Sequence, residues 1–151
     1  MQRALFCGAH LYFRLTRAMT LGVRAAVLDS EGRVFLVRHT YTPGWHLPGG
    51  GVEVGESLEE ALAKELREEA SIRMTGSPRL HGIFFNRPLS PRDHVAIYAV
   101  REFVLEGVKQ PDREIAEAGF FPLGALPDGT TAGTRRRLEE IARGLQPPSD
   151  W

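Results

Sequence analysis

Glutamates are concentrated in one short stretch of the chain, at a spacing that could hold a cation. Residues 53–69 contain seven of the nineteen acidic residues and only two basic ones. On a helix, Glu65, Glu68 and Glu69 stand three or four positions apart, so their carboxylates converge on one edge. Carboxylates crowded at a buried edge repel one another unless a cation lies among them, and hard divalent cations prefer such oxygen ligands. From charge alone, a divalent metal site and a solvated acidic helix face are both open.

A glycine-rich loop precedes the acidic stretch and favours the metal site. Residues 41–51 contain two prolines and four glycines. This composition excludes a regular helix or strand and indicates a shaped loop whose backbone can approach a ligand closely. Its carbonyl and amide groups are expected next to the carboxylates, where a bound metal could bridge to a phosphate oxygen.

The element that must position the carboxylates is a helix predicted over residues 57–70. Ser57 and Glu60 have the spacing of a capping box. Leucines at positions 58, 62 and 66 define a buried stripe. A helical wheel at ~100° per residue places Glu65 and Glu69 beside that stripe, so the acidic edge is expected to border the core.

The rest of the chain predicts a mixed set of strands with two or three helices in one α/β domain. Residues 20–29 and 34–37 are rich in β-branched and apolar residues, and the turn residues 29–32 between them predict a β-hairpin. A proline-rich loop at 87–93 is of the kind that borders a binding site. Further strands are expected at 79–86, 94–104 and 117–121, and a second helix at 134–143.

Composition and charge exclude several classes of protein. The 151 residues are 42% hydrophobic and 25% charged, as in an ordinary globular domain. Nineteen basic residues balance nineteen acidic ones, which argues against a protein that coats nucleic acid. No apolar stretch approaches the ~20 residues of a membrane helix, so no membrane partner is expected. The single cysteine, Cys7, forbids an intrachain disulfide and suits a reducing compartment, which predicts a cytoplasmic location.

Three segments are expected along the chain. Residues 1–19 are interpreted as an N-terminal extension, residues 20–146 as the functional domain and residues 147–151 as a C-terminal tail. The extension is expected to pack on the domain or on a second subunit, and in the second case the protein forms a homodimer.

The stretch from residue 50 to residue 72 resembles the Nudix box. The family pattern reads Gly, five residues, Glu, seven residues, then Arg-Glu-apolar-x-Glu-Glu-x-Gly-apolar, and every spacing is matched. The lead-in at 45–51 is also similar to that of the family. Five key positions carry the family residue: Gly50, Glu56, Glu65, Glu68 and Glu69.

Two positions depart from the family pattern. Lys64 stands in place of the arginine that holds Glu56 in the family, and lysine keeps the charge but loses the bidentate fork. Ser71 stands in place of a glycine, and if its backbone is left-handed, serine costs about 1 kcal/mol. A looser support of the site by Gly50, Glu56 and Lys64 is expected, rather than an inactive site.

The resemblance implies an α/β/α sandwich with a mixed β-sheet that hydrolyses a pyrophosphate linkage in a nucleoside diphosphate joined to another moiety. It implies Mg²⁺, or Mn²⁺, held by Glu65, Glu68, Glu69 and the Gly49 carbonyl. A carboxylate then accepts the proton of the attacking water. The resemblance makes Glu65 one candidate base, and an acid on a later loop is the other. The catalytic carboxylates are therefore expected among Glu65, Glu68 and Glu114, with Glu117 as a further candidate on that loop.

Four further side chains are candidates for contacts with the substrate. Arg38 and Arg87 could bind phosphates, although lone arginines commonly pair with carboxylates or lie in solvent. Trp45 and Phe85 could stack on a base, although core packing is the usual role of such residues. The small-molecule substrate is left open among oxidised nucleotides, ADP-ribose, dinucleoside polyphosphates and sugar nucleotides.

A second function is open beside the hydrolase. The departures at Lys64 and Ser71 motivate a Nudix-fold nucleotide-binding or regulatory module with weak or no catalysis. The retention of every expected carboxylate argues against it, because a degenerate site is expected to lose some of them.

Overall fold

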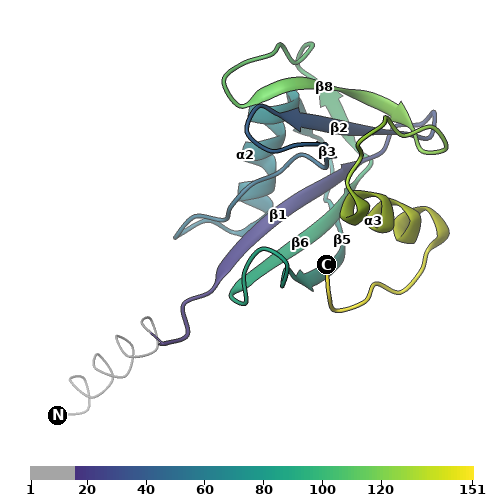
Figure 1. Ribbon diagram of the computed structural model, residues 1–151. Coiled ribbons are helices and arrows are strands. Elements are labelled where there is room, and N and C mark those ends of the chain that lie inside the picture. Colours follow the sequence, from purple (N-terminus) through teal and green to yellow (C-terminus); the bar gives the residue numbers. More distant parts are fainter. Residues whose placement is uncertain (1–15) are drawn as a thin grey trace.

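The computed structural model describes residues 16–151 (Figure 1). Its strands and helices in chain order are β1 (Thr20–Val27), β2 (Arg33–His39), β3 (Trp45–His46), α2 (Leu58–Ala70), β4 (Ile72–Met74), β5 (Arg79–Phe85), β6 (Asp93–Val100), β7 (Phe103–Leu105), β8 (Ile115–Pro122) and α3 (Ala132–Arg143). Most of the extension expected over residues 1–19, with its predicted contact to a second subunit, lies outside this range. Within it, no helix is long and apolar enough to cross a membrane.

The described strands form two three-stranded sheets and a short ribbon. In the first sheet β1 pairs in parallel with β6, and β6 pairs antiparallel with β5, which gives the mixed pairing that the sequence predicts. In the second sheet β2 lies between β3 and β8 and is antiparallel to both. The segment predicted as one strand over 94–104 is divided, because β6 ends at Val100 and β7 pairs instead with β4.

The predicted hairpin between the first two strands is wrong. Its turn forms, since the Asp29 carboxylate accepts hydrogen bonds from the backbone N–H groups of Glu31 and Arg33 at 3.0 and 2.9 Å. Beyond one bridge between Leu28 and Val34, however, the two strands take different partners. β1 pairs with β6, whereas β2 pairs with β3 and β8. Local turn chemistry decides the reversal of the chain, and long-range pairing decides the sheets.

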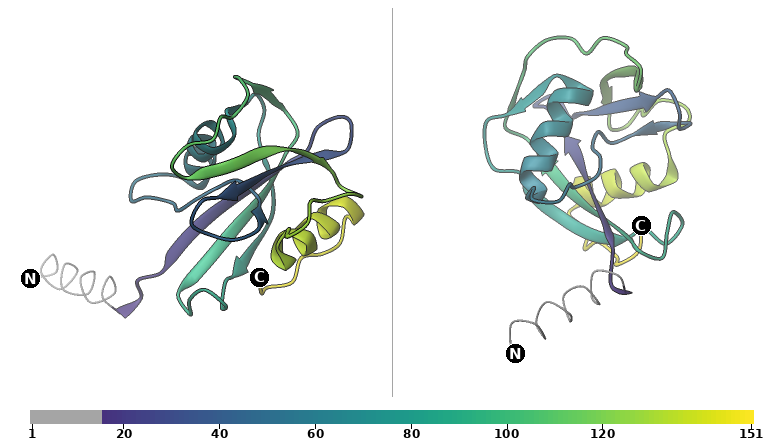
Figure 2. Two further views of the ribbon diagram at one scale, coloured as in Figure 1. Left: turned by 45° about the horizontal axis from the view of Figure 1, so that its top comes forward. Right: turned by 90° about the vertical axis from the view of Figure 1, so that its left-hand side faces the viewer.

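Two apolar clusters lie on opposite sides of the strands, and one helix packs in each (Figure 2). Leu62 and Leu66 of α2 belong to the cluster that contains Val23 of β1. Leu138 and Ile141 of α3 belong to the other cluster. Successive residues of a strand face opposite sides, so β1 contributes to both clusters. This arrangement confirms the predicted α/β/α sandwich.

Helix α2 begins and ends as its sequence predicts. The Ser57 side chain accepts the Glu60 N–H, and the Glu60 carboxylate accepts the Ser57 N–H at 2.8 Å, which completes the capping box. At the other end, Ser71 adopts φ +54° and ψ +37°, and its N–H donates to the carbonyls of Leu66 and Arg67. The left-handed conformation expected where the family has glycine is therefore present in a serine.

Replacing Ser71 with glycine is expected to stabilise the protein by about 1 kcal/mol, because glycine adopts the left-handed conformation without a Cβ penalty. Urea unfolding of the metal-free protein measures this change. Ser57→Gly provides the contrast, since it removes the capping hydroxyl and is expected to destabilise the same helix. A Ser71→Gly variant of unchanged or lower stability would show that serine at this position carries no strain.

The last residues of the chain pack against β5 rather than extending from the domain. The Phe85 N–H donates to the Ser149 carbonyl at 2.8 Å, and the Trp151 N–H donates to the Phe85 carbonyl at 3.1 Å. The Trp151 ring stands edge-on to the Phe84 ring at 6.0 Å, and a Cβ on Gly133 would lie 2.5 Å from the indole nitrogen. The segment expected as a tail over 147–151 thus contributes to the layer that contains α3.

Candidate functional site

The glycine-rich loop lies along the free edge of β1 and brings its backbone next to α2. The N–H groups of Val23 and Ala25 donate to the carbonyls of Gly50 and Pro48, each at 2.9 Å. Gly49 has φ +145°, and a Cβ at this residue would lie 2.0 Å from the Val23 carbonyl oxygen. Only glycine fits there, so the close approach of this loop to β1 depends on its composition.

Glu69 is held in place by a main-chain donor and a histidine. Only 5% of its surface is exposed. One carboxylate oxygen accepts the Gly49 N–H at 2.8 Å, and the other lies 2.8 Å from His39 Nε2. A buried carboxylate is costly without such donors. His39 on β2 is a site residue that sequence reasoning missed, because its partner lies thirty positions away in the chain.

Glu65 is half-buried and has no hydrogen-bond or ion-pair partner within the described range. Its carboxylate packs against Gly50, where a Cβ would lie 2.5 Å from Oε1. Burial raises the pKa of Glu65, and the negative charges of Glu69 and Glu68 raise it further. Of the three carboxylates expected to converge, Glu65 and Glu69 therefore lie together beside the loop, while the Glu68 side chain is exposed.

Lys64 makes the contact with Glu56 that the family pattern implies. Its Nζ donates to Glu56 Oε1 at 3.0 Å, and this contact joins the loop before α2 to the middle of the helix. The Glu53 N–H donates to the other Glu56 oxygen at 3.0 Å. The Glu53 N–H and Lys64 together lower the pKa of Glu56. A lysine therefore replaces the family arginine as a hydrogen-bond donor, with one donor group on one carboxylate oxygen.

Glu65 and Glu69 line a cavity of about 440 Å³. Its wall is formed by the start of β1, the glycine-rich loop, the loop between β5 and β6, and Glu114. The β5–β6 loop is fastened by Asp93, which accepts hydrogen bonds from the Thr20 hydroxyl at 2.6 Å and the Asn86 amide at 2.7 Å. The proline-rich loop expected near a binding site therefore does border this cavity.

The loop that carries Glu114 is tied to the last turn of α2. Lys109 Nζ donates to the Glu68 carbonyl at 2.6 Å and also to the Asp112 carboxylate. The other Asp112 oxygen accepts the N–H groups of Glu114 and Ile115 at 2.9 and 2.8 Å. The Ile115 N–H and Lys109 hold the pKa of Asp112 well below its usual range. Glu114 is exposed, but its backbone is held in one position relative to the helix.

The donor chemistry fits a hard divalent cation. Glu65 supplies an uncompensated carboxylate, and Glu68 lies exposed three residues further along the same helix. In the described part, however, no group of three His, Cys, Asp or Glu side chains is already assembled around a metal position. The Gly49 carbonyl accepts a hydrogen bond from Arg24 Nη1 at 2.5 Å. A metal held by the predicted ligands would need the exposed Glu68 carboxylate to turn inward, and it would compete with the positive charge of Arg24 at the Gly49 carbonyl.

The four side chains predicted to contact substrate do not line this cavity. Arg38 pairs with Glu117 at 2.5 Å. Trp45 is buried in the second apolar cluster. Phe85 stacks on His94 with ring centroids 5.2 Å apart, and Arg87 lies 4.8 Å from the Phe85 centroid. These contacts are the pairing and packing alternatives that the sequence left open.

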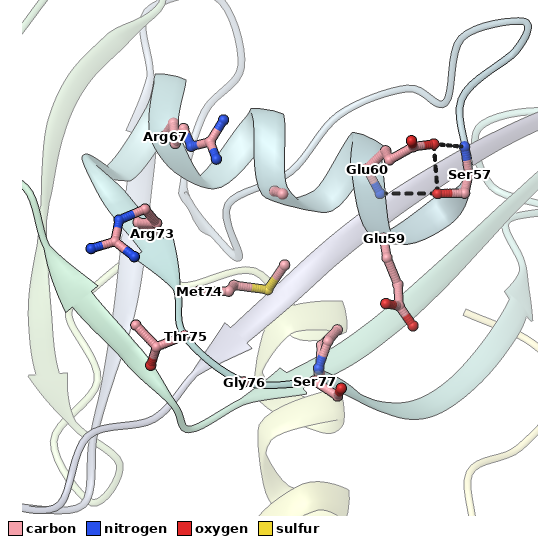
Figure 3. Close-up of a pocket in the computed structure, with 11 residues that line it drawn as sticks. Ser57, Glu59, Glu60, Arg67, Arg73, Met74, Thr75, Gly76 and Ser77 are labelled. Carbon is pink, nitrogen blue, oxygen red and sulfur yellow. Dashed lines mark hydrogen bonds between the residues drawn. The ribbon is translucent and has the colours of Figure 1, made fainter.

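A larger hollow of about 590 Å³ lies on a different side of α2 (Figure 3). Its charged groups are of both signs and are in part already engaged: Glu60 caps the helix, and Arg73 pairs with Glu106 at 2.8 Å. Arg67 and Glu59 also line it. Glu65, Glu68 and Glu69 do not line this hollow, so the smaller cavity is the candidate site.

Comparison with known proteins identifies the family of this chain. A family model described as the NUDIX domain matches residues 19–141. ADP-ribose pyrophosphatase of Methanocaldococcus jannaschii is 30% identical over 104 residues, which are 67% of this chain and 61% of that protein. The 8-oxo-dGDP phosphatase NUDT18 of Homo sapiens is 27% identical over 142 residues, which are 85% of this chain and 40% of that protein. The matches thus span less than two thirds of either relative.

A solved structure gives the same result at the level of the fold. A MutT NUDIX hydrolase from Burkholderia pseudomallei has a TM-score of 0.69 and 28% identity, over 81% of this chain and 97% of that one. The residues that the family model matches include the glycine-rich loop, α2 and the loop of Glu114, all of which contribute to the wall of the cavity. The chain belongs to the Nudix family.

Proposed function

We propose that this protein hydrolyses the pyrophosphate linkage of a nucleoside diphosphate joined to another moiety, with the help of a divalent cation. The observation that carries the proposal is Glu65, a half-buried carboxylate without a partner in the described range, beside Glu69 and a glycine-rich loop. Two relatives are named for the hydrolysis of nucleotides of this class, ADP-ribose and 8-oxo-dGDP. Members of the family generally use divalent metals.

The chain's own residues prepare the position for Mg²⁺ or Mn²⁺. Glu65, Glu68, Glu69 and the Gly49 carbonyl would hold the cation. When bound, it supplies charge neutralisation for the phosphates and lowers the pKa of a water molecule. His39 and the Gly49 N–H orient Glu69, and the missing side chain of Gly50 lets the Glu65 carboxylate approach the loop.

A carboxylate of this cavity accepts the proton of the attacking water. The candidates for this role are Glu65 and Glu68 of α2 and Glu114 of the loop before β8; Glu65 and Glu114 line the cavity, and Glu68 is exposed beside it. A base within hydrogen-bond reach of the water speeds the step by about 10²–10⁴-fold. The hydrogen bonds of Lys109 and Asp112 hold the backbone of Glu114 in a fixed place relative to α2.

The contact between Arg24 and Gly49 favours the alternative of a binding module, because it puts a positive charge beside an expected metal ligand. A substrate panel separates the two functions: ADP-ribose, 8-oxo-dGDP, a dinucleoside polyphosphate and a sugar nucleotide, each incubated with Mg²⁺ or Mn²⁺. Mass spectrometry of products formed in ¹⁸O-labelled water locates the cleaved bond. The hydrolase proposal expects labelled phosphate products from at least one compound, whereas binding without turnover would support the module.

Magnesium is expected to raise the melting temperature more at about pH 7.5 than at about pH 5. In the metal-free protein the pKa of Glu65 is raised on folding, so its contribution to stability is complete below the unfolded-state pKa and is lost as pH rises through the folded-state pKa. Mg²⁺ binds the ionised carboxylate, so its stabilising effect grows over the same pH range. Thermal scans with and without Mg²⁺ measure this difference.

Glu65→Gln is the matched variant for these scans. It is expected to remove most of the magnesium effect at both pH values, because the amide carries no charge to be neutralised. A magnesium effect that is equally large at both pH values in the wild type would contradict the assignment of Glu65 as a ligand.

A further inference from the structure

Arg24 is the only basic residue among the described residues that line the candidate cavity. Four carboxylates also line it, from Glu65, Glu69, Asp93 and Glu114. A diphosphate entering this cavity therefore meets a strongly acidic wall with one positive side chain. Because phosphates are bound by charge-assisted hydrogen bonds, the placement of this arginine is significant for any phosphorylated ligand.

The guanidinium of Arg24 uses only part of its hydrogen-bonding capacity. Its Nη1 donates to the Gly49 carbonyl at 2.5 Å and lies 3.4 Å from the Leu47 carbonyl. Within the described range, no group accepts a hydrogen bond from its Nε or Nη2. A guanidinium has five N–H donors, so several remain for a ligand. The positive charge is also felt by Glu65, whose pKa it lowers against the larger opposing effects of burial and the neighbouring glutamates.

The arginines that sequence reasoning proposed for phosphates are committed to other groups. Arg38 pairs with Glu117, and Arg87 lies between Phe85 and Asp150. The sequence did not indicate a role for Arg24, because an arginine at an outward-facing position of an alternating strand is expected to lie in solvent. Its position is evident only once the glycine-rich loop lies along β1.

We propose that Arg24 binds the substrate's phosphates and that, in the metal-free protein, it rests on the Gly49 carbonyl that the metal would otherwise use. This inference rests on the proposed function, since it deepens the description of the same site. It has two consequences of opposite direction. Loss of Arg24 frees the carbonyl and removes a positive charge from the metal position, while it also removes the phosphate contact.

The first measurement is Mn²⁺ binding without any nucleotide, followed by electron paramagnetic resonance. Arg24→Gln is expected to bind Mn²⁺ at least about threefold more tightly than the wild type, because a repelling cation is gone. Arg73→Gln is the matched control: it also removes a strand arginine, one that pairs with Glu106 away from the cavity. Its Mn²⁺ affinity is expected to equal that of the wild type.

The second measurement is the affinity for α,β-methylene-ADP, a diphosphate that resists hydrolysis, at saturating Mn²⁺ for each variant. Arg24→Gln is expected to bind this probe about tenfold more weakly, as for the loss of a charge-assisted hydrogen bond. Arg24→Lys keeps the charge without the planar fork, so its affinity is expected to lie between the two. Arg73→Gln is expected to bind the probe as the wild type does.

The opposite directions separate this role from a structural one. If Arg24 only stabilises the glycine-rich loop, Arg24→Gln weakens Mn²⁺ and probe binding together, and that result overturns the proposal. Unchanged affinity for both ligands overturns it as well. If circular dichroism shows that Arg24→Gln does not fold, Arg24→Lys replaces it in both measurements. A lysine variant that binds the probe as tightly as the wild type but binds Mn²⁺ more weakly contradicts the proposal. A wild type that binds Mn²⁺ but not the probe counts against the proposed substrate class, while the Mn²⁺ titration still tests the competition at Gly49.

Discussion

Replacing Glu68 with glutamine is expected to lower metal-dependent kcat by about a hundredfold or more while the fold stays intact. Glu68 is exposed on α2, and its charge raises the pKa of neighbouring Glu65. The substitution keeps the shape of the side chain but removes a negative ligand from a site that must hold a divalent cation. A hundredfold loss corresponds to about 2.7 kcal/mol of barrier.

The measurement is steady-state turnover of the substrate that the panel identifies, with thermal unfolding in parallel. Glu59→Gln is the matched control, because Glu59 is an exposed glutamate of the same helix that lines the hollow on its other side. It is expected to retain wild-type turnover. Equal turnover in Glu68→Gln and Glu59→Gln would remove Glu68 from the site and favour a solvated acidic face at this position.

Replacing Glu69 with alanine is expected to damage both stability and activity, whereas glutamine is expected to damage activity alone. Alanine leaves the buried His39 ring and the Gly49 N–H without their acceptor, and each unsatisfied buried group costs about 1–3 kcal/mol. Glutamine keeps an oxygen for the Gly49 N–H and an amide beside His39. It removes the negative charge that the metal requires.

Urea unfolding and Mn²⁺ titration of the two Glu69 variants test this separation. The glutamine variant is expected to unfold near the wild-type midpoint but to bind Mn²⁺ at least about tenfold more weakly. The alanine variant is expected to unfold at a clearly lower urea concentration. Similar stability of both variants would mean that His39 and the glycine-rich loop do not depend on the Glu69 carboxylate.

The local features of this site could be predicted from the sequence because their partners are close in the chain. The capping box of Ser57 and Glu60 follows from spacing along one helix, and the left-handed Ser71 follows from the glycine that the family has at this position. Glu56 and Lys64 are only eight positions apart, and their contact also forms as expected. Helical periodicity likewise places Glu65 beside the buried leucine stripe.

The features that the sequence did not reveal depend on distant pairing. His39 meets Glu69 only because β2 and α2 lie on one cluster, and Arg24 meets Gly49 only because a loop takes the free edge of β1. The same long-range choice separated the first two strands, which the turn at Asp29 had indicated as a hairpin. The role of Trp45 could not be predicted for a different reason. An aromatic residue in a glycine-rich loop can equally well stack on a base or pack in the core, and the structure shows that Trp45 is buried.

The anchoring of Lys109 has a consequence for how this part of the chain can change in length. Because Lys109 and Asp112 fasten the segment before β8 to the end of α2, the position of Glu114 does not depend on the path taken before Lys109. Val108 and Gly107 precede this anchor, and both are exposed. An exposed loop tolerates added residues at a small entropic cost. Insertions before Lys109 can therefore reshape the surroundings of the cavity without displacing its acidic side chain.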